Sequence, residues 1–234
     1  MFIVSEISPQ FGNDLDVAEQ MILESKMAGA NAAKLQLYPA EMFSPEPVDP
    51  YVKSRELSFE DFKRLKTYGD KVGLPVFATA FDEERLGWCL ELDQAYYKIA
   101  ARQHKENPEL VDKVTSMGKT VFVSIPHDYD VSAVEVRKGC VYLHCIVQYP
   151  TLLEDVIVPT FHDTIFEGIS DHSIGIAAAL LAAARGAKYL EKHYTINYAW
   201  QRSNEKAHLG AMTQEDLRAI KRITSDMERI LTAN

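Results

Sequence analysis

The sequence contains few of the residues that mark disulfide frameworks, disordered linkers or collagen-like repeats. Its 234 residues include only 3 Cys, 11 Gly and 10 Pro. The cysteines, Cys89, Cys140 and Cys145, form no CxxC pair, and their odd number fits a reducing compartment. Because 47% of the residues are hydrophobic and 25% are charged, the chain can bury one substantial core, which excludes disorder.

A membrane-spanning segment and a basic surface are also missing. The longest apolar run, around residues 174–184, is shorter than the ~20 residues of a spanning helix. The N-terminus MFIVSEISPQ has no basic region followed by a long apolar stretch. Lys and Arg number 25 against 34 Asp and Glu, and no basic stretch is dense enough to follow a phosphate backbone. We therefore predict a cytoplasmic protein that binds neither membranes nor nucleic acid, although lysines in a cleft can still attract a small anion.

Short β-branched or apolar runs alternate with helical patterns along the chain, which is typical of parallel βα units. The predicted strands are residues 2–7, 33–37, 76–80, 96–100, 120–124, 141–145, 166–170 and 189–193. The predicted helices are residues 16–29, 58–72, 83–92, 108–117, 173–185 and 214–231, with irregular connections at 126–138 and 148–163. Thr213 and Asp216 indicate a capping box, and Gly29, Gly73, Gly118 and Gly186 follow helices where a left-handed residue is favourable.

Eight strand–helix units in this length favour one α/β fold, a single (β/α)8 TIM barrel, over an open doubly wound sheet. No GxGxxG segment follows the first strand, as a dinucleotide-binding sheet would require. The barrel would occupy residues 1–234 as one domain, and the chain ends just after the eighth helix. We expect no room for an appended domain.

Functional side chains of such barrels project from the carboxyl ends of the strands. The polar residues predicted there are Glu6, Lys34, Gln36, Thr79, Lys98, Ser124, Ser170, Asp171, His172, Glu191, Lys192 and His193. A lysine inside a strand buried on both faces is costly unless an anion pairs with it. Lys34 and Lys98 therefore either form salt bridges, with Glu6 or Glu191, or bind a phosphate or carboxylate. Two such lysines in different strands favour the ligand site.

Two histidines, His172 and His193, end adjacent strands and are candidate metal ligands, although for either one alone a structural role is the simpler interpretation. Glu6 is then a third ligand, a base or a lysine partner. His144 beside Cys145 is predicted to pack in the core, because no third residue orients a Cys–His nucleophile. The remaining histidines, His104, His127, His162 and His208, are predicted to be solvated.

Eight segments together resemble one known family: EIS, AGANAAKLQ, FATAFDEE, YYKIA, MGKTVFVS, LHCIVQYPTLLEDV, GISDHSIG and GAKYLEKHYT. SDHSIG and EKHYT are specific in combination. The chain resembles the sialic acid synthase family, whose members condense phosphoenolpyruvate with an N-acylated sugar. The resemblance implies a transferase of sialic acid and other nonulosonic acid biosynthesis that forms a carbon–carbon bond and gives a 2-keto-3-deoxy sugar acid.

The resemblance also implies roles for the residues above. Phosphoenolpyruvate would be bound by Lys34, Thr79, Lys98, Ser124 and Ser170, and a Mn²⁺ or Mg²⁺ ion by His172 and His193. The ion would polarise the open-chain aldehyde of the sugar acceptor as a Lewis acid. Glu6 would position the aldehyde or the attacking water, and Gln36 and Tyr149 would line the sugar side. The implied catalytic residues are Glu6, Lys98, His172 and His193.

The sequence departs from the family pattern on the sugar side. After YYKIA, Ala101, Arg102 and Gln103 replace Ser-Gly-Glu, Val147 replaces Asn, and residues 203–208 replace Gly-Pro-Asp-His-Ala with Glu205 as stand-in acid. The antifreeze-like domain that caps the neighbour's site in family dimers has no counterpart in this sequence. A homodimer is therefore possible, but the sequence does not decide it. We expect an acceptor other than N-acetylmannosamine. Arg102 either replaces a lost anion contact or fills space.

Two other functions remain open on the residues alone. One is a noncatalytic barrel that binds a phosphorylated or carboxylated small ligand, favoured by the changed acceptor motifs. The other is an aldolase that forms a Schiff base on Lys98 or Lys34.

Overall fold

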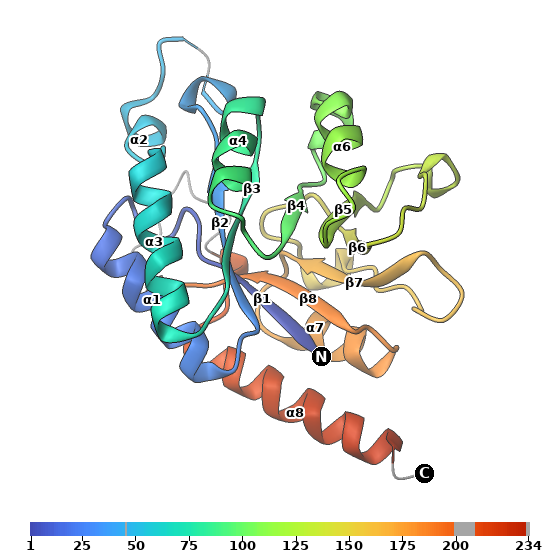
Figure 1. Ribbon diagram of the computed structural model, residues 1–234. Helices are drawn as coiled ribbons and strands as arrows, with labels where there is room; N and C mark the ends of the chain where they lie inside the picture. The colour runs from blue at the N-terminus through green and yellow to red at the C-terminus, as the bar shows by residue number, and fades with distance from the viewer. Residues whose placement is uncertain (45, 199–208, 233–234) are drawn as a thin grey trace.

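The computed structural model describes residues 1–44, 46–198 and 209–232. Eight parallel strands form a closed barrel in chain order, with β8 paired to β1, and helices surround it (Figure 1). The strands are β1 (Phe2–Glu6), β2 (Ala32–Leu37), β3 (Val76–Ala80), β4 (Tyr97–Ile99), β5 (Val121–Pro126), β6 (Cys140–Cys145), β7 (Phe166–Asp171) and β8 (Tyr189–His193). The predicted (β/α)8 TIM barrel is confirmed, and each predicted strand overlaps an observed one.

The helices are α1 (Leu15–Ala28), α2 (Pro50–Lys53), α3 (Phe59–Val72), α4 (Glu83–Glu91), α5 (Gln103–Glu106), α6 (Pro108–Thr115), α7 (Ala177–Ala184) and α8 (Gln214–Thr232). Short 3₁₀ turns lie at η1 (Ala40–Met42), η2 (Val131–Ala133) and η3 (Leu153–Asp155). The segments 126–138 and 148–163 are irregular apart from η2 and η3, as predicted. The predicted start of α7 at residue 173 is wrong, because Gly175 has a φ of +75° and the helix begins only after it.

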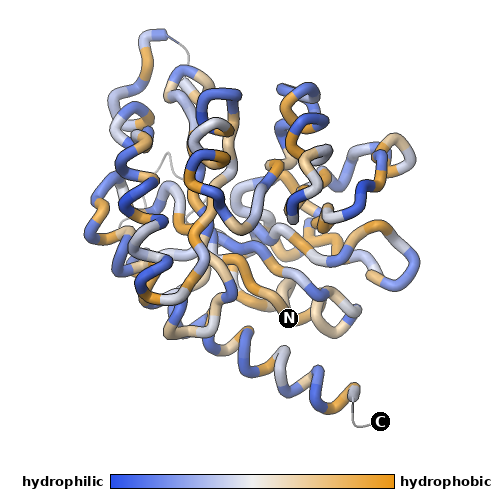
Figure 2. The backbone as a smooth tube through the Cα atoms, viewed as in Figure 1, coloured by the Kyte–Doolittle hydropathy of each residue, from blue (hydrophilic) through white to orange (hydrophobic). Residues whose placement is uncertain are grey.

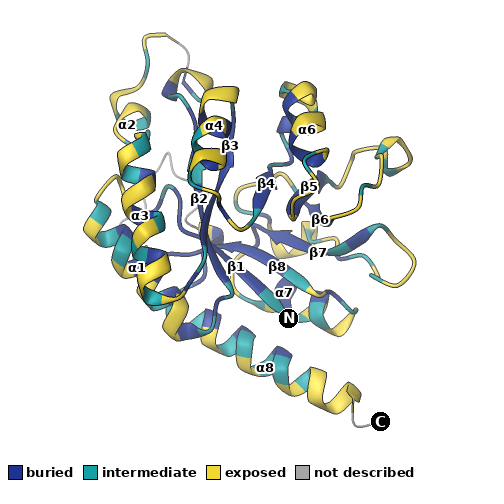
Figure 3. Ribbon diagram, viewed as in Figure 1, coloured by how far each residue is buried: buried dark blue, intermediate teal, exposed yellow. Residues whose placement is uncertain are grey.

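Local end signals explain where the helices begin and end. Thr213 Oγ1 accepts from the backbone N of Asp216, while the Asp216 carboxylate accepts from the backbone N of Thr213, so the predicted capping box is present. The four predicted cap glycines all have positive φ: Gly29, Gly73, Gly118 and Gly186. The outer helices expose a hydrophilic face and bury an apolar one against the strands (Figures 2 and 3).

The core has an outer layer between the helices and the strands and an inner layer inside the barrel. Phe2, Phe77, Tyr96, Phe122 and Tyr189 fill the amino-terminal end of the barrel interior, with neighbouring ring centroids 5.6–5.9 Å apart. These aromatic side chains close the barrel interior at its amino-terminal end, which leaves the carboxyl end of the strands for a ligand site.

Two further expectations concern residues 203–208 and a membrane-spanning helix. Residues 203–208, including Glu205 and His208, lie outside the described residues. In the described parts of the chain, no helix combines the length and the apolar character that crossing a membrane demands.

Candidate active site

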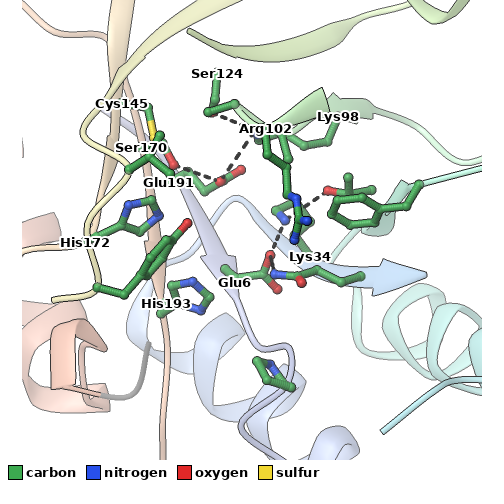
Figure 4. Close-up of a pocket in the computed structure, with 18 of the residues that line it drawn as sticks. Glu6, Lys34, Lys98, Arg102, Ser124, Cys145, Ser170, His172, Glu191 and His193 are labelled. Atoms are coloured by element: carbon green, nitrogen blue, oxygen red, sulfur yellow. Dashed lines mark hydrogen bonds and ion pairs between the residues drawn. The ribbon is translucent and has the colours of Figure 1, made fainter. Parts of the chain in front are cut away.

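A cavity of about 450 Å³ opens at the carboxyl end of the barrel (Figure 4). Side chains alternate along each strand, so residues two apart share the inward face. All ten site residues predicted from the sequence line this cavity: Glu6, Lys34, Gln36, Thr79, Lys98, Ser124, Tyr149, Ser170, His172 and His193. The fold thus brings together ten predicted residues from seven strands and from the connections after β6 and β7.

On one side of the cavity, Lys34 forms a buried ion pair with Glu6, and the two residues are 3% and 2% exposed. Lys34 Nζ also donates to Thr79 Oγ1 at 3.1 Å. The Glu6 carboxylate accepts further hydrogen bonds from the backbone N of Ser8 at 2.9 Å and from Gln36 Nε2 at 3.2 Å. Glu6 is thus held in one position by several donors.

Lys98 occupies the other side and is also 3% exposed. Its Nζ donates to Ser124 Oγ at 2.7 Å and to the carbonyl oxygen of Ile99 at 2.8 Å. Glu191 lies 3.7 Å from the same Nζ and accepts from Ser170 Oγ at 3.1 Å through Oε1. Among the described residues, the buried Oε2 of Glu191 has no hydrogen-bond partner. Both lysines therefore have a carboxylate partner and share one cavity.

The pKa directions follow from burial and from these charges. Burial lowers the pKa of Lys98, and the attraction of Glu191 only partly opposes this. Burial acts the same way on Lys34, but Glu191 and Glu6 outweigh it and raise its pKa. Burial raises the pKa of Glu6. For Glu191 the effect of burial is exceeded by Lys34 and Lys98, which hold its pKa below the usual value.

His172 and His193 lie across the cavity with ring centroids 5.8 Å apart. Nδ1 of His172 donates to the carbonyl oxygen of Ile146 at 2.9 Å. With the Gln10 amide turned so that its oxygen faces His193, that oxygen accepts from Nδ1 of His193 at 3.0 Å. Each ring then has its lone pair on Nε2, and burial lowers the pKa of His172, which favours the neutral form that binds metal.

The two imidazoles thus fit a divalent metal, but the protein offers only part of a coordination shell. In residues 1–44, 46–198 and 209–232, no group of three His, Cys, Asp or Glu side chains lies close enough to hold an ion. Glu6 pairs with Lys34 and does not complete such a group. Water or substrate oxygens would have to complete the coordination shell. Tyr149 packs against His172 with ring centroids 4.1 Å apart and lines this side of the cavity.

Several residues near the strand ends serve the structure. Lys192 points out of the barrel, where its Nζ donates to Asp171 Oδ2 at 2.8 Å. His144 packs edge-on against Phe166 with centroids 5.3 Å apart, in agreement with its predicted core role, and burial lowers its pKa to about 4. Burial raises the pKa of Cys145 to about 12, so this thiol in the cavity wall is a poor nucleophile.

The prediction that the remaining histidines are solvated is wrong for His104. Its side chain is partly buried, and Nε2 lies 3.1 Å from the carbonyl oxygen of Ser124. The ring also packs on Tyr129. His127 and His162 are exposed, as predicted.

The sequence reasoning missed part of the cavity wall. Glu191 was predicted at a strand end and as a lysine partner but not as a site residue, although its two-residue spacing from His193 in β8 places both on the inward face. Phe43, Phe81 and Glu106 were not predicted at all, because they come from connections whose path no periodicity reveals. Among the changed family positions, Ala101, Arg102 and Val147 line the cavity. Gln103 does not line the cavity; its Nε2 donates to the carbonyl oxygen of Ala80 at 2.9 Å and so links α5 to the end of β3.

Comparisons with known proteins agree with this arrangement. The NeuB family profile matches residues 21–234. An uncharacterized protein of Methanocaldococcus jannaschii is 34% identical over 211 residues, which cover 84% of this chain and 62% of that protein. The human N-acetylneuraminate-9-phosphate synthase is 28% identical over 237 residues, which cover 89% of this chain and 66% of the synthase. The chain therefore spans less than two thirds of the length of these two relatives.

A solved structure shows the same fold. The N-acetylneuraminic acid (sialic acid) synthetase from Leptospira borgpetersenii serovar Hardjo-bovis, in complex with citrate, superposes with a TM-score of 0.89 at 30% sequence identity. The match covers 98% of this chain and 84% of that structure. Because the family profile covers most of the sequence and the barrel matches throughout, the chain belongs to the NeuB family.

Proposed function

We propose that this protein is a metal-dependent synthase that condenses phosphoenolpyruvate with an aldose acceptor to form a 2-keto-3-deoxy sugar acid. One observation carries the proposal. Lys34 and Lys98, each 3% exposed, come from different strands and line one cavity together with His172 and His193. Two ammonium groups in one cavity can face the phosphate and the carboxylate of one anionic ligand, although Glu6 and Glu191 already pair with them in the ligand-free protein.

Phosphoenolpyruvate, the donor substrate, would lie on the cavity floor, the buried layer formed by Lys34, Lys98, Glu6 and Glu191. Lys34 and Lys98 supply charge for the phosphate and carboxylate of phosphoenolpyruvate, and both are already oriented by hydroxyl groups, from Thr79 and Ser124. Ser170, which donates to Glu191, adds a third hydroxyl on the same side. Such fixed donors need no rearrangement when the negative charge arrives.

The acceptor would lie between the donor and the histidines. His172 and His193 would hold a Mn²⁺ or Mg²⁺ ion, which when bound supplies Lewis-acid polarisation of the sugar aldehyde. Glu6 would orient the aldehyde or the attacking water, and burial raises the pKa of its carboxyl above the usual value, which makes it a better proton acceptor. Gln36 and Tyr149 line the sugar side of the cavity.

The reaction balances without any redox partner. The methylene carbon of phosphoenolpyruvate forms a bond to the aldehyde carbon, and the aldehyde oxygen takes up a proton. Water adds to the neighbouring carbon, which bears the phosphate, and its loss of a proton balances the one taken up. The C–O bond to phosphate then breaks and leaves a keto group. The products are the keto acid and inorganic phosphate.

Phosphate release tests the proposal. Purified protein with Mn²⁺ or Mg²⁺ and phosphoenolpyruvate should release phosphate when a suitable N-acylated hexosamine or other aldose is present. Lys98→Ala should abolish release, whereas Lys105→Ala, which removes an exposed charge outside the cavity, should not. No turnover across a broad sugar panel with metal verified as bound would contradict the proposal. Calorimetric binding of phosphoenolpyruvate without turnover would instead identify a noncatalytic binding barrel.

A second candidate, a Schiff-base aldolase, is favoured by one observation. Burial lowers the pKa of Lys98, as an amine nucleophile requires. Borohydride reduction in the presence of pyruvate or another carbonyl substrate would then trap an adduct on Lys98. The absence of an adduct by mass spectrometry would exclude this candidate.

A further inference from the structure

Arg102 is a third cation in the cavity, and it follows β4 at a position where the family usually has glycine. Its side chain extends into the pocket in Figure 4. The guanidinium carbon lies 4.3 Å from the ring centroid of Phe43, and Nε donates to Glu106 Oε2 at 2.6 Å. The cation–π contact and the ion pair together hold the guanidinium in place before any ligand binds.

This tether uses only one edge of the guanidinium. Among the described residues, Glu106 is the only hydrogen-bond or ion-pair partner of Arg102, and it engages Nε. The donors on both Nη atoms have no protein partner in that part of the chain. A planar fork with two such nitrogens matches a phosphate or a carboxylate in two-point contact. Arg102 is therefore built as an anion-binding group rather than as filler.

Arg102 lies nearer the mouth of the cavity than Lys34 and Lys98, the proposed site for phosphoenolpyruvate. Lys34 and Lys98 are each 3% exposed and lie on the floor, whereas the Arg102 side chain is 35% exposed. The two lysines already match the two charged groups of phosphoenolpyruvate. A molecule that binds above the donor would be the one to meet Arg102.

The barrel order sets the direction of that molecule. β4, which precedes Arg102, lies four strands from β8 in the closed eight-stranded order, so the two are on opposite sides. His193 ends β8 and His172 follows β7. An acceptor with its aldehyde at the histidines would span the cavity and place its far end at Arg102.

We propose that Arg102 is a specificity-determining residue that binds a phosphate or carboxylate group on the end of the acceptor remote from its aldehyde. The protein then selects acidic aldoses over neutral ones. This inference rests on the proposed synthase function for the identity of the acceptor, but anion binding at Arg102 can be measured without turnover.

Calorimetry on the intact protein with Mn²⁺ tests the inference with four ligands. They are phosphoenolpyruvate, N-acetylmannosamine, its 6-phosphate, and its 6-carboxylate analogue, N-acetylmannosaminuronic acid. In Arg102→Ala, affinity for the acidic sugars should fall roughly tenfold to hundredfold, the range for a charged hydrogen bond. Affinity for the neutral sugar and for phosphoenolpyruvate should stay within about twofold. The acidic sugar that loses more affinity in Arg102→Ala shows whether Arg102 prefers a phosphate or a carboxylate.

Two further variants separate charge from geometry. Arg102→Lys keeps the charge but loses the planar fork, so it should restore only part of the affinity for the acidic sugars. Lys105→Ala removes an exposed charge from α5 outside the cavity and should change nothing. Equal losses in both alanine variants would show a general charge effect and overturn the inference.

Other outcomes also decide between the proposals. The inference is overturned if wild type binds neither acidic sugar, if Arg102→Ala binds them as well as wild type does, or if phosphoenolpyruvate or the neutral sugar loses as much affinity. If wild type binds the acidic sugars through Arg102 but binds no phosphoenolpyruvate, the synthase proposal fails and the Arg102 site stands. If phosphate is released with neutral sugars and Arg102→Ala has no effect on binding or release, the synthase proposal stands and the Arg102 inference fails.

Discussion

Replacing Lys34 and Lys98 by methionine should have opposite effects on the free energy of unfolding, although both substitutions remove an ammonium group that is proposed to bind phosphoenolpyruvate. Burial lowers the pKa of Lys98, so the folded state disfavours its charged form relative to the unfolded chain. For a lysine with a depressed pKa, this penalty is present below the unfolded pKa and is complete once the pH is below the folded pKa. At pH 7.5, Lys98→Met removes a buried charge, and we expect a melting temperature equal to or above that of wild type.

Lys34→Met has the opposite sign. The pKa of Lys34 is raised because Glu191 and Glu6 outweigh its burial, so the folded state favours its charge. The substitution leaves the Glu6 carboxylate, 2% exposed, without a cation in contact. Breaking a buried pair in this way costs about 3 to 5 kcal/mol. For a chain of this size, that corresponds to a fall of roughly 6 to 20 °C in melting temperature.

Calorimetric melting of the ligand-free proteins at pH 7.5 measures both effects, with circular dichroism to confirm the fold. Phosphate release from phosphoenolpyruvate should be lost in both variants. The reasoning is refuted if Lys98→Met melts as far below wild type as Lys34→Met. In that case the 3.7 Å pair of Lys98 with Glu191 would stabilise the fold as strongly as the Lys34–Glu6 pair does.

Burial lowers the pKa of His144 to about 4, so stability should fall by on the order of 2 kcal/mol as the pH drops from about 6.5 to 4. Urea midpoints of His144→Phe should lack this slope. Burial raises the pKa of Cys145 to about 12, so mass spectrometry should show iodoacetamide labelling roughly a thousandfold slower than for an ordinary thiol. Gly168→Ala should destabilise by about 1 to 3 kcal/mol, because its Cβ would lie 2.0 Å from the Tyr189 carbonyl oxygen. Gly87→Ala, with open space in helix α4, should stabilise by about 0.5 to 1 kcal/mol in the same urea assay; equal effects would contradict the steric argument.

The barrel and the lysine–histidine set were predictable because both follow from short-range patterns. Alternation of period two in buried strands fixes which residues share a face, and parallel strands end at one rim. Lys34 and Gln36 in β2 show this directly, since both line the cavity. Counting back from His193 by the same alternation would have placed Glu191 on the inward face of β8 and Lys192 on the outward face.

Contacts between distant loops were not predictable. Phe43 meets Arg102 only because the connection after β2 folds over the end of β4, and no local pattern specifies that path. Helix α5 has four residues, too few for helical periodicity to show. The start of α7 was misplaced because the apolar periodicity continues through Gly175, whose left-handed backbone is invisible to a hydrophobic pattern.

The charges on the cavity floor explain why donor binding should depend on groups above it. Without ligand, Lys34 and Lys98 are balanced by Glu6 and Glu191, so the floor has no excess positive charge for a triply charged phosphoenolpyruvate. Compensation must come from proton uptake by Glu6, whose pKa burial raises, or from cations outside the floor. Arg102 is paired with Glu106 and is proposed here to bind the acceptor. A divalent ion at the proposed histidine site would be a second source of positive charge besides protonated Glu6, so we expect added Mn²⁺ to strengthen the binding of phosphoenolpyruvate as well as to activate the aldehyde.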